Sequence, residues 1–167
     1  RLRSSFSMAL LKAHGTYVGM PSNDDMGNSE VGHNCLGTGR VVDQGAKLVQ
    51  VALETKSMFE GEVWKDCVAK AKVGATLHFL GLVSDGNVHS HINHLLMMLE
   101  QAKSEGLERC LVHGLLDGRD VGEYSALDYF EPLETKINEM GYGVATGGGR
   151  MLITMDRYNA DWDMVSK

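Results

Sequence analysis

Residues 76–87 read TLHFLGLVSDGN, and residues 109–120 read RCLVHGLLDGRD; these two stretches decide the fold. In each, an apolar run typical of a buried strand is followed at once by a turn of Asp, Gly and other polar residues. Residues 92–103, between them, have the apolar spacing of an amphipathic helix. The repeated order of strand, turn and helix predicts βαβ units, and therefore an α/β protein with flanking helices on a mainly parallel sheet.

The same reading extends to both sides of these stretches. Downstream, residues 125–140 form a second helical pattern, with Pro132 in its first turns or kinking it, and residues 142–146 form a third strand that the glycines of 147–149 end. Upstream, we expect a helix over 46–58 and a strand within 1–20. Residues 21–45 are rich in glycine and polar groups, so we expect a loop-heavy segment that carries a site.

Polar residues follow each predicted strand. Asp85 and His89 come after the first, Asp117, Arg119 and Asp120 after the second, and Arg150 after the third. Ligands of parallel sheets bind outside the carboxyl ends of the strands, so these three loops should gather at one edge of the sheet.

Three arginines, Arg119, Arg150 and Arg157, each follow a turn or a glycine run. A guanidinium group donates two parallel hydrogen bonds to a carboxylate or phosphate, so the three predict a binding site for a small phosphorylated acid. Asp120 has two interpretations that spacing alone leaves open. In the first interpretation it has a role in the site, either orienting Arg119 or exchanging a proton with a substrate hydroxyl. In the second it is a turn residue without a role in the site.

Three neighbouring histidines are candidate metal ligands: His89, His91 and His94. On a helix His91 and His94 would share a face, but His89 would lie at the helix start and point elsewhere. We therefore expect no metal on this trio, and expect His89 alone to donate to phosphate or carry a proton.

The run MGNSEVGHN, residues 26–34, places Ser29 at a turn or at the mouth of a short helix. Free backbone N–H groups there can hold an anion, so Ser29 is a candidate nucleophile towards an anionic group. Serine needs a base or a metal ion for this task, and no Ser-His-Asp triad is evident. His33 lies one helical turn away, where it could face Ser29 or cap a helix.

Composition narrows the class of protein. The 167 residues are 43% hydrophobic and 23% charged, as in soluble globular proteins. The net charge of −6 argues against nucleic acid and anionic membranes as partners. Three cysteines without a CxxC pair predict free thiols in a reducing compartment, and the apolar run at 8–11 is too short for a signal peptide.

Seven motifs occur in order across residues 12–165: MGNSEVGHN, LGTGR, DQGAKL, LVSDGNVHSH, DGRDV, GGGRM and MDRY. In this order they closely resemble those of the cofactor-independent (2,3-bisphosphoglycerate-independent) phosphoglycerate mutases of the alkaline phosphatase superfamily. The resemblance implies a two-domain α/β enzyme in which a transferase domain is inserted into a phosphatase-like domain. It also implies the interconversion of 3-phosphoglycerate and 2-phosphoglycerate in glycolysis and gluconeogenesis, by a cytoplasmic monomer that needs no 2,3-bisphosphoglycerate.

The resemblance assigns roles to residues that match the family motifs. Ser29 matches the serine that is phosphorylated and that also binds metal, in a site for two manganese ions, with magnesium, zinc or cobalt as alternatives. Asp120 matches a substrate-binding residue that helps to move the hydroxyl proton. The remaining matches are to substrate-binding positions: His89, Arg119, Arg150 and Arg157.

The chain also departs from the family pattern. A DGWG-type segment with the first metal-binding aspartate is absent, the other metal ligands lie downstream of Lys167 in a full-length member, and two substrate arginines and a lysine are missing. We therefore expect a fragment of the phosphatase-like domain over 1–44, a C-terminally truncated transferase domain over 45–167, and no activity from this chain alone. The alternatives are a non-catalytic phosphoglycerate-binding module and a metal-dependent phosphatase or phosphotransferase of the same superfamily.

Overall fold

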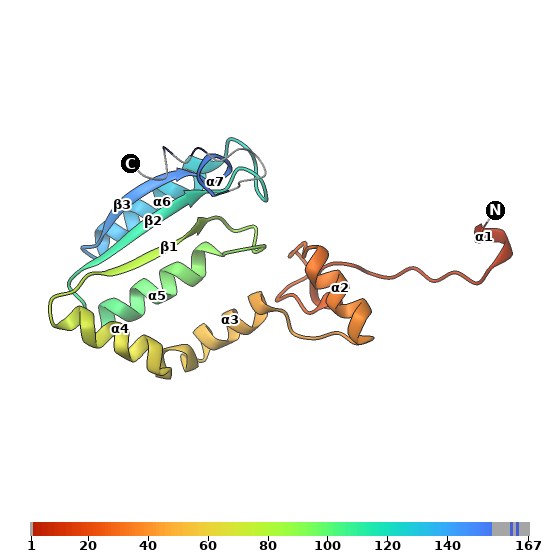
Figure 1. The fold of residues 1–167 in the computed structure, drawn as a ribbon, viewed down its shortest axis with the longest axis horizontal. Coiled ribbons are helices and arrows are strands. Elements are labelled where there is room, and N and C mark those ends of the chain that lie inside the picture. The colour runs from red at the N-terminus through yellow and green to blue at the C-terminus, as the bar shows by residue number, and fades with distance from the viewer. Residues whose placement is uncertain (1, 155–160, 162, 164–167) are drawn as a thin grey trace.

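The computed structural model describes residues 2–154, 161 and 163. Its centre is a sheet of three strands, β1 (Leu77–Val83), β2 (Cys110–Leu116) and β3 (Gly143–Gly149), in the order β1-β2-β3. Both pairings are parallel, with Leu77 opposite Cys110 and Leu111 opposite Gly143. The crossovers are α5 (Ile92–Ser104) and α6 (Ala126–Glu139), so the predicted α/β architecture with two βαβ units is confirmed (Figure 1).

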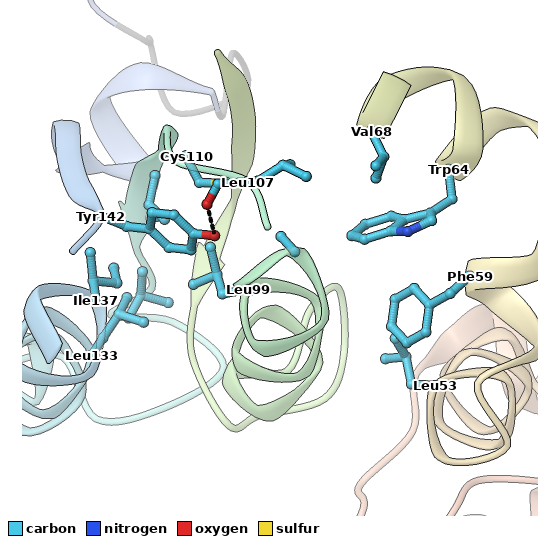
Figure 2. Packing of buried hydrophobic residues seen from close by; sticks show 13 residues of the cluster. Leu53, Phe59, Trp64, Val68, Leu99, Leu107, Cys110, Leu133, Ile137 and Tyr142 are labelled. Atoms are coloured by element: carbon cyan, nitrogen blue, oxygen red, sulfur yellow. Dashed lines mark hydrogen bonds between the residues drawn. The ribbon is translucent and has the colours of Figure 1, made fainter. Parts of the chain in front are cut away.

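The main hydrophobic core lies between one face of the sheet and the helices. Figure 2 shows Leu99 from α5 and Leu133 and Ile137 from α6 packed together, all almost fully buried. The buried Tyr142 hydroxyl donates a 2.9 Å hydrogen bond to the Leu107 carbonyl within this core. On the opposite face of the sheet the side chains are less covered: Leu80 is 75% exposed.

Two helices and a 3-10 turn precede the sheet: α3 (Gly45–Glu54), η2 (Ser57–Glu60) and α4 (Glu62–Lys72). The predicted helix over 46–58 is therefore too long. It ends at Glu54 because Lys56 takes a left-handed conformation, with φ of 60°, that an α-helix does not accommodate. The sequence interpretation missed α4, which is anchored to the core by Trp64 and Val68, one turn apart.

The glycine run 147–149 does not end the third strand, as predicted, but belongs to it. Gly147 pairs with Gly114, and Gly149 with Leu116. A Cβ atom on Gly148 would lie 2.0 Å from the Ile153 side chain, in the short helix α7 (Arg150–Ile153) that follows. The glycines let that helix fold back closely onto the strand.

The N-terminal part lies beside the sheet domain and is joined to it through α3 (Figure 1). It contains α1 (Leu2–Ser5), η1 (Gly15–Val18) and α2 (Ser29–Thr38). A smaller core of Val18, Met20 and Val31 holds α2 against η1. The predicted strand within 1–20 is wrong, because residues 2–20 form no strand. Among the described residues no helix is long and apolar enough to cross a membrane.

Candidate functional site

A buried arginine joins the ends of two strands. Arg150 begins α7 directly after β3 and is 3% exposed. Its Nη1 donates to Asp117 Oδ1 at 2.9 Å and to Asp120 Oδ2 at 2.8 Å. The predicted convergence of the loops after β2 and β3 is thus present in the structure.

The carboxylate of Asp117 organises the loop after β2. Its Oδ1 also accepts hydrogen bonds from the Arg119 and Asp120 amides, at 3.1 and 3.0 Å. Its Oδ2 accepts one from Ser84 Oγ at 2.6 Å. Gly118, which follows Asp117, has a φ of 63°, in the left-handed region that glycine adopts readily. Burial alone would raise the pKa of Asp117, but these hydrogen bonds and the nearby Arg150 charge lower that pKa below its usual value.

His89 completes the cluster from the loop after β1. Its Nε2 lies 3.7 Å from Asp120 Oδ2, and its side chain is 58% exposed. Arg119 is also exposed, at the rim of the same loops. The structure therefore brings together four of the predicted site residues: His89, Arg119, Asp120 and Arg150. Arg157 lies outside the described residues.

The other two histidines of the trio have structural roles. His91 caps α5 by accepting a hydrogen bond from the Asn93 amide at 3.1 Å. His94 is buried and its Nε2 lies 2.7 Å from Gln50 Oε1 of α3. Burial, and then the nearby His91, lower the pKa of His94. Across the described residues no three His, Cys, Asp or Glu side chains form a group that could hold a metal ion.

Ser29 is the first residue of α2, as its position in the sequence predicted, and it is exposed. Asn28 caps the helix, since its Oδ1 accepts a hydrogen bond from the Val31 amide at 3.0 Å. His33 Nδ1 lies 3.3 Å from Ser29 Oγ but 2.6 Å from the Ser29 carbonyl oxygen. A carbonyl only accepts, so Nδ1 carries the proton and does not act as a base towards Oγ in this arrangement.

A hydrogen bond joins the Ser29 segment to the sheet domain. Asn87, in the loop after β1, donates from Nδ2 to Asp25 Oδ1 at 2.7 Å. Asn87 is buried and has a φ of 53°, a left-handed conformation that Asn tolerates. Next to this bond a polar cleft separates the two parts, lined by Asn28, Glu30, Gln44 and Val88 among others. No local pattern indicates this contact, because Asp25 and Asn87 lie in separate loops 62 positions apart.

Comparison with known proteins supplies the family. The family model described as the BPG-independent PGAM N-terminus matches residues 49–167. The chain belongs to the 2,3-bisphosphoglycerate-independent phosphoglycerate mutase family.

Individual mutases of this family are similar over almost the whole chain. A probable 2,3-bisphosphoglycerate-independent phosphoglycerate mutase of Leptospira interrogans is 53% identical over all of this chain and 32% of its own length. The tobacco (Nicotiana tabacum) mutase is 49% identical over 95% of this chain and 29% of its own length. The crystal structure of Leishmania mexicana phosphoglycerate mutase at low cobalt concentration has a TM-score of 0.78 and 46% identity, over 93% of this chain and 30% of that one. The chain thus spans about a third of the length of these mutases.

Proposed function

We propose that the full-length protein interconverts 3-phosphoglycerate and 2-phosphoglycerate, in glycolysis and gluconeogenesis, through a phosphoserine at Ser29 and without 2,3-bisphosphoglycerate. The observation that carries the proposal is the Arg150–Asp120–His89 cluster at the carboxyl ends of the parallel strands. Around it, the exposed His89 and Arg119 offer donors for an anion beside the Asp120 carboxylate, which can exchange a proton. The family membership of the chain supports the same reaction.

In this proposal the residues at the strand ends bind and orient the glycerate. Arg119, Arg150, His89 and Arg157 hold the carboxylate and phosphate groups. Ser29 Oγ attacks phosphorus and releases its proton to solvent; the bond from phosphorus to the glycerate oxygen breaks, and that oxygen takes a proton from Asp120. After the glycerate reorients, Asp120 removes the proton from its other hydroxyl, which attacks the phosphoserine; the bond from phosphorus to Ser29 Oγ breaks, and Oγ regains a proton from solvent.

We further propose two manganese ions in the full-length enzyme, with magnesium, zinc or cobalt as alternatives, and Ser29 Oγ as one ligand. When bound, such ions lower the pKa of the serine hydroxyl and stabilise charge on the phosphoryl group. The described residues do not supply the remaining ligands, since Ser29 has no group of His, Cys, Asp or Glu side chains around it that could hold an ion.

The organisation of the full-length protein is also a proposal. Residues 1–44 would belong to the phosphatase-like domain and 45–167 to the transferase domain, which agrees with the presence of two separate cores. We propose that the full-length protein is a cytoplasmic monomer. The three free cysteines support a reducing compartment such as the cytoplasm.

The test uses full-length protein with manganese and 3-phosphoglycerate labelled in its phosphate. We expect label on the peptide that contains Ser29, and at least a thousandfold loss of kcat in Ser29→Ala, since a nucleophile has been removed. Ser104→Ala, an exposed serine at the end of α5, is the matched control and should keep full activity. Full activity of Ser29→Ala without label on the protein would refute the proposal.

The same assay separates the mutase from a phosphatase of the superfamily. A mutase gives 2-phosphoglycerate with little inorganic phosphate, whereas a phosphatase releases phosphate and forms no isomer. The 167-residue chain by itself should show neither reaction, because no metal ligand set is present in its described residues. Isomerisation by this chain alone would contradict that expectation.

A further inference from the structure

Asp117 forms hydrogen bonds with residues at the ends of all three strands, although no sequence motif assigned it a role. Its side chain is 1% exposed, and both of its oxygens accept hydrogen bonds. The partners are Ser84 from the loop after β1, the Arg119 and Asp120 amides from its own loop, and Arg150 from the end of β3. One carboxylate therefore connects the ends of all three strands.

Ser84 extends this connection. While its Oγ donates to Asp117, it also accepts a hydrogen bond from the Gly86 amide at 3.1 Å. Ser84 itself is almost fully buried. The turn that leads to His89 is thus fixed to the same carboxylate as the turn that carries Arg119 and Asp120.

Arg150 depends on Asp117 for its place. Its Nη1 is shared between Asp117 and Asp120, and the Asp117 carboxylate is the more deeply buried of the two. A buried guanidinium that loses one carboxylate is left with an uncompensated donor and moves towards its remaining partner or to solvent.

We propose that Asp117 is a positioning residue, which holds Arg150, Asp120 and the His89 loop in the geometry that binds phosphoglycerate, without touching the substrate itself. The proposal rests on the mutase function proposed above. It predicts that loss of Asp117 weakens substrate binding in addition to any loss of stability, because three binding groups lose their common support.

The test compares Asp117→Asn with wild type in the full-length enzyme. Asparagine keeps the shape, but it loses the charge that faces Arg150 and cannot accept hydrogen bonds on both of its terminal atoms. We expect KM for 3-phosphoglycerate, and the dissociation constant measured by calorimetry, to rise about tenfold or more. Unchanged KM and dissociation constant would overturn the proposal.

The matched control is Glu105→Gln, at the opposite end of the strands. Glu105 accepts hydrogen bonds from Trp64 Nε1 and Gln101 Nε2, both at 2.8 Å, so its loss perturbs the same domain away from the site. We expect a lower Tm with unchanged KM. If Asp117→Asn behaves in the same way, its role is only structural and the proposal fails.

Two further measurements keep the test decisive. If Asp117→Asn does not fold, Ser84→Ala replaces it and should raise KM about threefold or more; an unchanged KM would refute the proposal. If wild type binds 3-phosphoglycerate without isomerising it, only the mutase function fails, and the dissociation constants still decide the role of Asp117. If wild type neither binds nor isomerises it, both proposals fail.

Discussion

At the scale of single residues, His94 links α5 to α3 through its contact with Gln50. Burial, followed by the proximity of His91, lowers the pKa of His94, whereas Glu54 acts in the opposite direction. The folded state therefore favours the neutral ring. The resulting stability is fully present above the ordinary histidine pKa, near 6.5, and is lost as the pH falls below it towards the lowered value.

His94→Gln should remove this dependence, since glutamine does not titrate and can still donate to Gln50. Below pH 6.5 the free energy of unfolding of wild type should fall with a slope of up to about 1.4 kcal/mol per pH unit from this group. Urea denaturation at a series of pH values measures the difference between the two proteins. The exposed His14→Gln serves as control and should keep the wild-type slope; parallel curves for wild type and His94→Gln would contradict the prediction.

Some residues of the strand-end site could be predicted from the sequence, and one could not. Asp120, Arg150 and His89 could be predicted to converge because the carboxyl ends of parallel strands share one edge. Asp117 was seen only as one more polar residue after a strand. Its importance comes from burial and from partners 33 positions away in each direction, Ser84 and Arg150, which no local pattern encodes.

At the scale of elements, α6 continues on both sides of Pro132, which the sequence placed in the first turns of the helix or at a kink. Pro132 is exposed and has no N–H to donate to the preceding turn. The helix survives because Leu133 and Ile137, one turn apart, are fully buried in the core. Packing therefore outweighs the unfavourable propensity of one residue.

Pro132→Ala should stabilise the protein, because alanine restores a backbone hydrogen bond and has the best helix propensity. We expect the free energy of unfolding to rise by about 1–3 kcal/mol. Urea denaturation measures this free energy of unfolding. The control is the neighbouring exposed Glu131→Ala, for which we expect the free energy of unfolding to change by about 0.5 kcal/mol or less. A lower stability of Pro132→Ala would show that the helix requires the proline geometry.

The end of one predicted strand and the whole of one helix escaped prediction for physical reasons. The strand β3 continues through three glycines because β2 supplies its hydrogen bonds and α7 needs the space, and both lie elsewhere in the chain. Helix α4 buries only Trp64 and Val68, so its apolar pattern is too sparse to stand out. An element that depends on pairing or packing with distant segments, and not on its own apolar pattern, is difficult to predict from the sequence.

At the scale of the whole molecule, a hydrogen bond between the loops of Asp25 and Asn87 joins the N-terminal part to the sheet domain. Burial raises the pKa of Asp25, but hydrogen bonds from Asn87 and Ser22 outweigh it, so the pKa is lowered and the carboxylate is charged at neutral pH. This contact fixes the segment that carries Ser29 beside the loop that carries His89.

Asn87→Asp should disrupt the contact, since it replaces a donor by a second carboxylate facing Asp25. In the full-length enzyme we expect kcat/KM to fall about tenfold, equivalent to about 1.4 kcal/mol. Asn87→Gly keeps the left-handed backbone and adds no charge, so its loss should be smaller. Equal activities of Asn87→Asp and wild type would show that the Ser29 segment is positioned without this contact.

The parallel pairing has a consequence for the order of assembly. Each strand can pair with the next only after an entire crossover helix has been made, so the edges meet late during synthesis. Arg150 follows β3 without a linker, and its two ion pairs can close only once that last strand has docked. Within this three-stranded sheet the strand-end site is therefore completed last, because Asp117 and Asp120 form their ion pairs with Arg150 only after β3 has paired.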